Sequence, residues 1–191
     1  MDALSMAVIG GMAAAAIYVA MVYNRLVQIK HNVSKAWANI DVLLKQRHDE
    51  LPKLIETCRQ YMKFEQETLT RVMEARSRVS TARETRDMPA LGQAEAALRS
   101  TVGNLLAVAE AYPELRTDQT FLQLQARIVS LESAIADRRE FYNESANINN
   151  VRIEQFPDVV VASLFAFGPA PLLHFAAADK ADIDVRQAFT A

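Results

Sequence analysis

Five side chains early in this sequence are of types that bind metals or transfer protons. His48, Asp49 and Glu50 are adjacent, and Glu65 and Glu67 lie two residues apart. A metal site needs ligands that converge on one point, and paired catalytic carboxylates must face the same space. Side chains one or two positions apart on a helix point in different directions. The spacing therefore predicts a solvated turn at His48 and neither a metal site nor a catalytic pair.

Cys58 is the one cysteine of the chain, and it falls on an apolar stripe with no obvious base nearby. We interpret it as a small buried hydrophobic residue rather than a nucleophile. The sequence contains no Ser-His-Asp grouping, no glycine-rich phosphate loop and no metal signature. The net charge of −2 gives no reason to expect nucleic acid, which needs a concentrated basic surface. We therefore predict a protein that is not an enzyme, has no cofactor and does not bind nucleic acid.

Three charged residues occupy positions in otherwise apolar helical stripes: Arg76, Glu95 and Arg138. Helix geometry brings the three residues to similar positions along the axis of the predicted bundle. A buried charge must be paired, because an unpaired one is strongly destabilising. We predict a buried Arg–Glu–Arg layer that sets the register of the helices. Two alternatives stay open. The long side chains extend into water from the edges of the stripes, or the layer is a functional polar pocket.

The elements that would position these residues are helices, because the chain has only 5 Gly and 6 Pro in 191 residues. Apolar residues recur at spacings of three and four, which is typical of amphipathic helices. Pro52 suits a first helical turn or a kink, a break near Lys63 to Glu65 stays open, and Asp87 suits a helix cap. The predicted helices span residues 24–50, 51–84, 89–112 and 118–156. Their short connections predict an all-α domain at 24–157, an antiparallel up-and-down four-helix bundle with packing like that of a coiled coil.

An uncharged apolar segment, Ala3 to Tyr23, runs into the first of these helices. As a helix it would be about 31 Å long, enough to cross a hydrocarbon core of about 30 Å. We predict a transmembrane anchor at residues 1–23 that is continuous with the bundle. A cleaved signal peptide is the alternative, which the length of the run and the lack of a preceding Lys or Arg disfavour.

The anchor carries small residues four positions apart, a spacing that lets helix backbones approach closely in lipid. They are Gly10, Gly11, Ala14 and Ala15. We predict self-association through this face, and chance occurrence in an alanine-rich helix is the alternative. The positive charges that flank the anchor, Arg25, Lys30 and Lys35, all follow it. The positive-inside rule then places the bundle in the cytoplasm.

Residues 158–191 differ in character from the helices before them. Val159 to Phe167 is a continuous apolar run, but Gly168, Pro169 and Pro171 make the segment too broken to span a bilayer. In an up-and-down bundle the fourth helix returns toward the membrane, so we predict an interfacial segment and then an extended tail. Packing against the bundle is the alternative. The residues expected in the interface are Val159, Leu164, Phe165, Phe167, Leu172 and Phe175.

An amide-rich patch lies late in the fourth predicted helix. Its members are Asn143, Asn147, Asn149 and Asn150. Asparagine is a poor helix former, so four asparagines within about two helical turns lower the stability of the helix locally. We expect them to form hydrogen bonds with the Tyr23-Asn24 end of the first helix, and a partner-binding surface is the alternative.

A set of short motifs is spread over essentially the whole chain. Its members are Tyr23-Asn24, Ala36-Trp37, Ile40-Asp41, Lys45 to Pro52, Leu54 to Thr57, Tyr61, Glu65, Glu67 to Leu69, Ala75-Arg76, Ala109 to Pro113, Phe121 to Gln125, Arg138, Tyr142-Asn143, Asn150, Phe156-Pro157 and Asp184-Val185. Together these motifs resemble the LemA family of bacterial membrane-anchored helical proteins. Gln46 stands where the family often has Arg, and Glu50 where it often has an apolar residue.

The resemblance implies one N-terminal membrane helix, a four-helix bundle and a place in the bacterial inner membrane, with no established activity. Some members of the family occur with organelle-forming or membrane-protease systems, which implies adaptor work. We therefore expect a single-pass scaffold or adaptor that self-associates and presents a helical surface to membrane proteins, a membrane protease among the candidates. The alternative is a lipid- or ligand-sensing helical bundle at the membrane surface.

Overall fold

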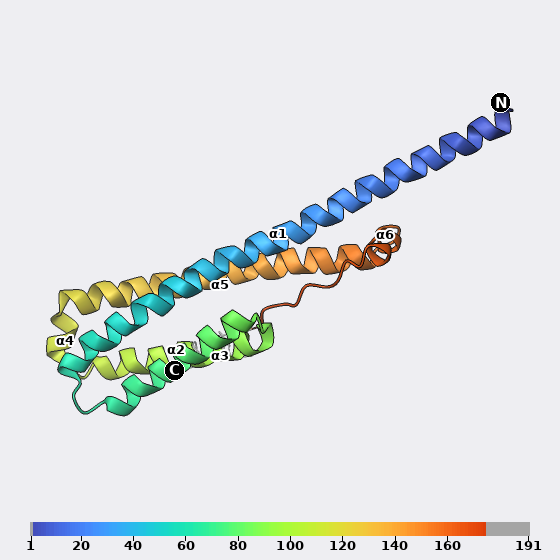
Figure 1. The fold of residues 1–191 in the computed structure, drawn as a ribbon. Coiled ribbons are helices and arrows are strands. Elements are labelled where there is room, and N and C mark those ends of the chain that lie inside the picture. The colour runs from blue at the N-terminus through green and yellow to red at the C-terminus, as the bar shows by residue number, and fades with distance from the viewer. Residues whose placement is uncertain (1, 175–191) are drawn as a thin grey trace, which may run out of the picture. The chain divides into compact units, whose positions relative to one another are not determined.

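A computed structural model describes residues 2–174, and every regular element in that range is a helix (Figure 1). The described part of the chain is therefore all-helical, as predicted, and its first element is a long apolar helix. Phe175 and the rest of the predicted tail lie outside the described residues. The six helices are α1 (Ala3–Tyr61), α2 (Gln66–Thr85), α3 (Met88–Ala109), α4 (Pro113–Thr117), α5 (Gln119–Glu154) and α6 (Asp158–Leu164).

The described chain divides into two compact units. The first contains residues 2–43 and 133–172, which cover the first part of α1, the second part of α5, and α6. The second contains residues 44–132 and 173–174, which cover the rest of α1, the hairpin of α2 and α3, α4 and the start of α5. Each unit is described by itself below.

Helix α1 is 59 residues long and continues through His48 and Pro52, so the predicted turn at His48 is wrong. The predicted helices at 24–50 and 51–84 consequently have wrong boundaries. Leu44, Leu51, Leu54 and Cys58 are all buried, so the apolar stripe passes through the proline without losing its phase. A proline in a helix removes one backbone hydrogen bond, and burial of this stripe on both sides of it holds the helix together.

The turn that the sequence suggested as a possible break, at Lys63 to Glu65, is where α1 gives way to α2. Met62 is buried at its start, and Phe64 is 95% exposed at its tip. Because Phe64 lies in the turn, it belongs neither to the apolar stripe of α1 nor to that of α2. This explains why Phe64 is out of phase with the apolar residues that flank it.

Helices α2 and α3 pack against each other as a helical hairpin closed by Arg86 and Asp87 (Figure 1). Arg86 has a φ of 53°, the left-handed conformation that ends many helices. Asp87 caps α3 as predicted, because its carboxylate accepts a hydrogen bond from the backbone N–H of Ala90 at 3.0 Å. Pro89 lies in the first turn of α3, where its missing N–H has no helical partner to lose.

The third predicted helix ends early, at Ala109, and the short helix α4 fills part of the expected turn. Pro113 begins α4 because a proline fits a first helical turn. Asp118 then caps α5, since its carboxylate accepts a hydrogen bond from the N–H of Phe121 at 2.8 Å. That hydrogen bond lowers the pKa of Asp118 below its usual value.

The predicted helix at 118–156 corresponds to α5, which ends at Glu154, and the first part of the apolar tail is a further helix, α6. Val161 and Ala162 of α6 are buried, whereas Val160 and Leu164 are exposed. The apolar run therefore has one face packed inside the first unit and one face outward. An apolar run with one buried face and one exposed face fits a short helix packed on its neighbours.

Candidate functional site

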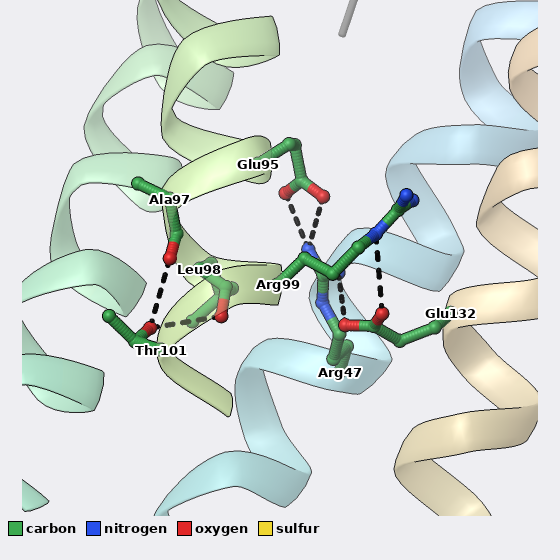
Figure 2. Close-up of polar contacts among 7 residues, drawn as sticks. All are labelled: Arg47, Glu95, Ala97, Leu98, Arg99, Thr101 and Glu132. Carbon is green, nitrogen blue, oxygen red and sulfur yellow. Dashed lines mark hydrogen bonds and ion pairs between the residues drawn. The ribbon is translucent and has the colours of Figure 1, made fainter. Parts of the chain in front are cut away.

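The most deeply buried charges of the second unit are Arg47 of α1 and Glu95 of α3 (Figure 2). Nη2 of Arg47 donates to both carboxylate oxygens of Glu95, at 2.5 and 2.6 Å. The two side chains are 3% and 4% exposed. A buried arginine and a buried carboxylate compensate each other's charge in this geometry. The pair joins α1 to α3 through a contact that an apolar side chain at either position could not make.

Two further charges extend this pair toward the surface of the second unit (Figure 2). Nη1 of Arg47 donates to Oε1 of Glu132 in α5 at 3.3 Å. Arg99 of α3 forms an ion pair with Oε2 of Glu132 at 3.5 Å. We call Arg47, Glu95, Arg99 and Glu132 the charge cluster. It contains two positive and two negative side chains, so it adds no net charge to the core.

Burial raises the pKa of Glu95 above its usual value, and the positive charge of Arg47 and its hydrogen bond offset part of that rise. The bidentate contact keeps the carboxylate as a partner for an arginine that stays protonated. The charge cluster can therefore set the register of α1, α3 and α5. Its groups are engaged with each other, and none is placed as an acid or base facing an open site.

The predicted layer of Arg76, Glu95 and Arg138 is right about the buried glutamate and wrong about its partners. Arg47, Arg99 and Glu132 were not identified as members of a site. Because α1 continues to Tyr61, position 47 faces the interior between buried Leu44 and Leu51. The spacing of Arg47 from Leu44 and Leu51, by three and four residues, places it on the buried face of α1, and this spacing was visible in the sequence.

Arg76 of α2 has a different role from the one predicted. Its Nε donates to the backbone carbonyl of His48 at 2.9 Å. In a regular helix that carbonyl would accept from the N–H of residue 52, which is a proline and has none. Arg76 therefore satisfies the carbonyl that Pro52 leaves without its helical partner. Arg138, the third predicted member, is exposed on α5 and takes no part in the charge cluster.

The first unit contains an apolar cluster where α1 meets α6. Its buried members are Val22 and Leu26 of α1, Ile153 of α5, and Val161 and Ala162 of α6, with Phe167 packed against them. Aromatic rings add to it: the ring centroid of Tyr23 lies 4.7 Å from that of Phe165 and 5.7 Å from that of Phe167. We call this set the membrane-side cluster, because Val22 and Tyr23 end the apolar part of α1.

Two of the late asparagines of α5, Asn149 and Asn150, bind the segment after α6 rather than the Tyr23-Asn24 end of α1, so the prediction is wrong for these two residues. Nδ2 of Asn149 donates to the Gly168 carbonyl at 3.2 Å. Asn150 donates to the Ala170 carbonyl at 2.9 Å and accepts from its N–H at 2.7 Å. The tail backbone needs hydrogen-bond partners, and these amides supply them.

Tyr142 holds the same segment at its far end, since its hydroxyl donates to the Pro171 carbonyl at 2.8 Å. Its ring also packs edge-on against Trp37 of α1, with the ring centroids 6.0 Å apart. Burial raises the pKa of Tyr142 above its usual value, which keeps the hydroxyl protonated as a donor. Residues 168–171 are thus fixed to α5 by side-chain hydrogen bonds.

The predicted interface residues take two kinds of position. Leu164 and Phe165 are exposed, whereas Val159, Phe167 and Leu172 are partly buried. Phe175 lies outside the described residues. Exposed apolar side chains therefore gather at the end of α6, and the others help to attach this segment to the first unit.

The predicted association face of α1 is open over its whole length. Gly10, Gly11, Ala14 and Ala15 are exposed, and a Cβ added at either glycine would meet no atom within 4 Å. No described residue of the chain covers this face. Association through it stays a prediction.

Two of the groups first considered for chemistry, Cys58 and His48, have shifted pKa values. Cys58 is buried, and burial raises the pKa of its thiol to about 11, so the thiol is protonated near neutral pH. His48 is partly buried, and burial followed by the charge of Arg76 lowers its pKa. Within residues 2–174, no three His, Cys, Asp or Glu side chains are grouped to hold a metal ion.

Comparison with known proteins agrees with the resemblance seen in the sequence. The model of the LemA family matches residues 36–186. The protein LemA of Metamycoplasma hominis is 24% identical over 164 residues, which are 86% of this chain and 74% of that protein.

Partial similarity extends to magnetosome proteins. MamQ 2 of Paramagnetospirillum magneticum is 33% identical over 78 residues, 41% of this chain and 29% of that protein. MamQ of Magnetospirillum gryphiswaldense is 30% identical over 100 residues, 52% of this chain and 37% of that protein. The chain thus spans about a third of the length of these magnetosome relatives.

Proposed function

This chain belongs to the LemA family, and from that premise we propose that it is a non-enzymatic scaffold or adaptor anchored in a membrane by α1. The observation that carries the proposal is the exposure of the anchor. Every residue from Asp2 to Met21 is exposed, although Ala3 to Tyr23 contains no charged residue. An apolar helix of this length with no protein packed around it requires lipid.

We propose a single-pass topology in the bacterial inner membrane with the helical domain in the cytoplasm. Helix α1 is the one helix among the described residues that is long and apolar enough to cross a bilayer. Arg25, Lys30 and Lys35 follow the apolar segment, and positive charges are retained on the cytoplasmic side. The partial similarity to magnetosome proteins supports a membrane-associated role.

We propose further that α1, α2, α3 and α5 form an antiparallel four-helix bundle with packing like that of a coiled coil. The short turns at residues 62–65 and 86–87 support this arrangement, since brief connections join antiparallel neighbours. The charge cluster supports it as well, because it links side chains of α1, α3 and α5. A helical domain on a membrane anchor is suited to present a surface rather than to catalyse a reaction.

Self-association through the anchor would give such a scaffold more than one binding surface. The face of Gly10, Gly11, Ala14 and Ala15 is small and open, which suits close approach of a second helix in lipid. Other membrane proteins, a membrane protease among them, are the proposed clients of the cytoplasmic surface. In the described residues the titratable groups do not converge on an open site, which disfavours an enzyme.

Crosslinking of the full chain in native membranes tests this proposal. We expect crosslinked dimers or larger species, and we expect Gly10→Leu combined with Ala14→Leu to reduce them several-fold because the added bulk separates the helices. Ser5→Leu is the matched control, since at about 100° per residue it lies on the opposite side of the helix. A monomer that captures no membrane protein would argue against a scaffold. Equal loss of dimers in the Ser5→Leu control would argue against this face.

The exposed apolar side chains at the end of α6 favour lipid sensing as the second candidate function. Leu164 and Phe165 are the clearest examples. A sensor would change its conformation or its partners with lipid composition, whereas a scaffold would not. Crosslinking in membranes of different lipid composition separates the two functions.

A further inference from the structure

We propose that α6 and the turn after it form a second, non-spanning contact with the bilayer, in which a lipid acyl chain occupies an apolar groove between Phe165 and the anchor. The proposal rests on the proposed function in one respect, which is that residues 3–23 of α1 cross the membrane. Beyond the proposed function, it assigns a lipid-binding surface to α6 and the turn that follows it.

The membrane-side cluster sets the height of α6 along the anchor. Val22 and Leu26 are the first buried residues of α1, and they contact Val161 and Ala162 of α6. The uncharged part of α1 ends at Tyr23. Helix α6 is therefore packed beside the last turn of the apolar span, the level at which a bilayer gives way to its headgroups (Figure 1).

The outward side of this region is apolar. Leu164 is 74% exposed and Phe165 is 48% exposed, and Phe156 and Val160, earlier in the same stretch of chain, are exposed as well. Single exposed apolar residues are ordinary, but several together mark a contact surface. Because this surface continues the lipid-facing surface of α1, the bilayer that surrounds the anchor is its partner.

The groove itself lies along the anchor and has a volume of about 520 Å³. The small side chains of Ala15, Ala16 and Ala20 leave it hollow, and Val19, Tyr23, Asn24 and Phe165 complete its lining. From Ala15 to Tyr23 it follows about 12 Å of helix, all within the apolar span. Its walls are almost entirely carbon, which suits an acyl chain rather than a polar ligand.

The polar groups of this region are arranged so that an apolar face can approach lipid. Asp158 of α6 is buried and forms an ion pair with Arg152 at 2.5 Å, so its negative charge does not face the surface. The backbone of residues 168–171 has hydrogen-bond partners in Tyr142, Asn149 and Asn150. Backbone groups near a bilayer are stable only when they are satisfied in this way.

Lys30 completes the site at headgroup depth. Its Nζ lies 6.0 Å from the ring centroid of Phe167, and it follows Tyr23 by about 10 Å of helix. A lysine at that height can reach a lipid phosphate while its stem packs on apolar residues. The occupant is therefore a phospholipid of the leaflet that surrounds the Tyr23 end of the apolar span, with its acyl chain in the groove.

Depth-dependent fluorescence quenching tests the contact in the full chain. In a Trp37→Phe background, the variant Phe165→Trp is placed in vesicles of phosphatidylcholine and phosphatidylglycerol with brominated acyl chains. Phe141→Trp is the matched control, because Phe141 is 49% exposed and also lies in the first unit. It precedes Ile153 by about 18 Å of α5. Tyr18→Trp, inside the span, reports on the anchor.

We expect quenching of the Phe165→Trp and Tyr18→Trp variants to exceed that of Phe141→Trp several-fold. Quenching of Phe165→Trp equal to the Phe141→Trp control, with Tyr18→Trp quenched, would overturn the second contact and leave the anchor intact. If Tyr18→Trp were not quenched either, both the anchor and the inference that rests on it would fail. Leu164→Trp repeats the measurement at a more exposed position, where the substitution disturbs packing least.

Protein density separates the acyl chain from a helix of another copy as the occupant of the groove. We expect the same quenching of Phe165→Trp in nanodiscs that hold one copy and in densely loaded vesicles. If crowding lowered the quenching of Phe165→Trp but not that of Tyr18→Trp, another copy of the chain would fill the groove and the lipid assignment would be wrong.

Discussion

Arg47 and Glu95 stabilise the second unit only as a pair. Each side chain is almost completely removed from water, and each has the other as its main partner. A buried ion that loses its partner keeps its desolvation cost without its compensating attraction. The energetic consequence of a substitution here depends on whether a charge is left behind, rather than on the number of hydrogen bonds removed.

We predict that Arg47→Met lowers the free energy of unfolding by about 3–5 kcal/mol, because it strands the buried Glu95 carboxylate. Adding Glu95→Leu should restore most of that loss, since two apolar side chains can pack in place of the pair. Urea unfolding of the detergent-solubilised chain, followed by circular dichroism, measures both effects.

Arg71→Met is the control for the Arg47 substitution. Arg71 pairs with Glu67 on the exposed face of α2, and its loss should change stability by no more than about 0.5 kcal/mol. A double variant as unstable as Arg47→Met alone would show that a stranded charge is not the cause.

At the level of elements, α1 combines an exposed apolar segment, a proline and two packing environments in one uninterrupted helix. The proline is the position at which the helix should be weakest, because it leaves the His48 carbonyl without its usual donor. The guanidinium of Arg76 supplies a donor from α2. The continuity of α1 therefore depends partly on a side chain from another helix.

A double-mutant cycle between Pro52 and Arg76 tests this dependence. Arg76→Met should destabilise the protein by about 1 kcal/mol when Pro52 is present, because the His48 carbonyl loses its hydrogen bond. In a Pro52→Ala background the backbone N–H at position 52 can bond to that carbonyl, so the same substitution should have a smaller effect. Arg78→Met, on the exposed side of α2, should show no coupling to position 52. Equal effects of Arg76→Met in both backgrounds would contradict the role assigned to Arg76.

At the scale of the whole molecule, the proposed topology places the helical domain on one side of the bilayer. The native Cys58 gives a favourable background for labelling, because it is buried and its pKa of about 11 keeps it in the unreactive thiol form. Phe64, in the turn between α1 and α2, is 95% exposed and suits a reporter cysteine.

We predict that Phe64→Cys is labelled by a membrane-impermeant maleimide in inside-out vesicles and protected in right-side-out vesicles. The unsubstituted chain, with Cys58 alone, should stay unlabelled in both and is the control. The opposite pattern for Phe64→Cys would place the domain on the outer side, against the orientation inferred from Arg25, Lys30 and Lys35.

Much of the local structure followed from residue order alone. The uncharged length of Ala3 to Tyr23, the cap at Asp87 and the helical spacing of α3 and α5 depend on neighbours in the sequence, and they were predicted correctly within a few residues. Such features arise from backbone hydrogen bonding and from the phase of apolar side chains. The apolar stripe also contains Arg47, but Pro52, five residues later, fits the start of a helix as well as a kink within one, so the sequence alone left the boundary undecided.

The partners of the buried charges were decided only by tertiary structure. Glu95 was recognised as buried, yet its pairing with Arg47 depends on how far α1 extends and how it is rotated against α3. The same is true of Asn149 and Asn150, whose amides hold the segment after α6, and of Arg76, which bonds to His48. A residue's own helix determines which face it occupies, but packing between helices determines which side chains meet there.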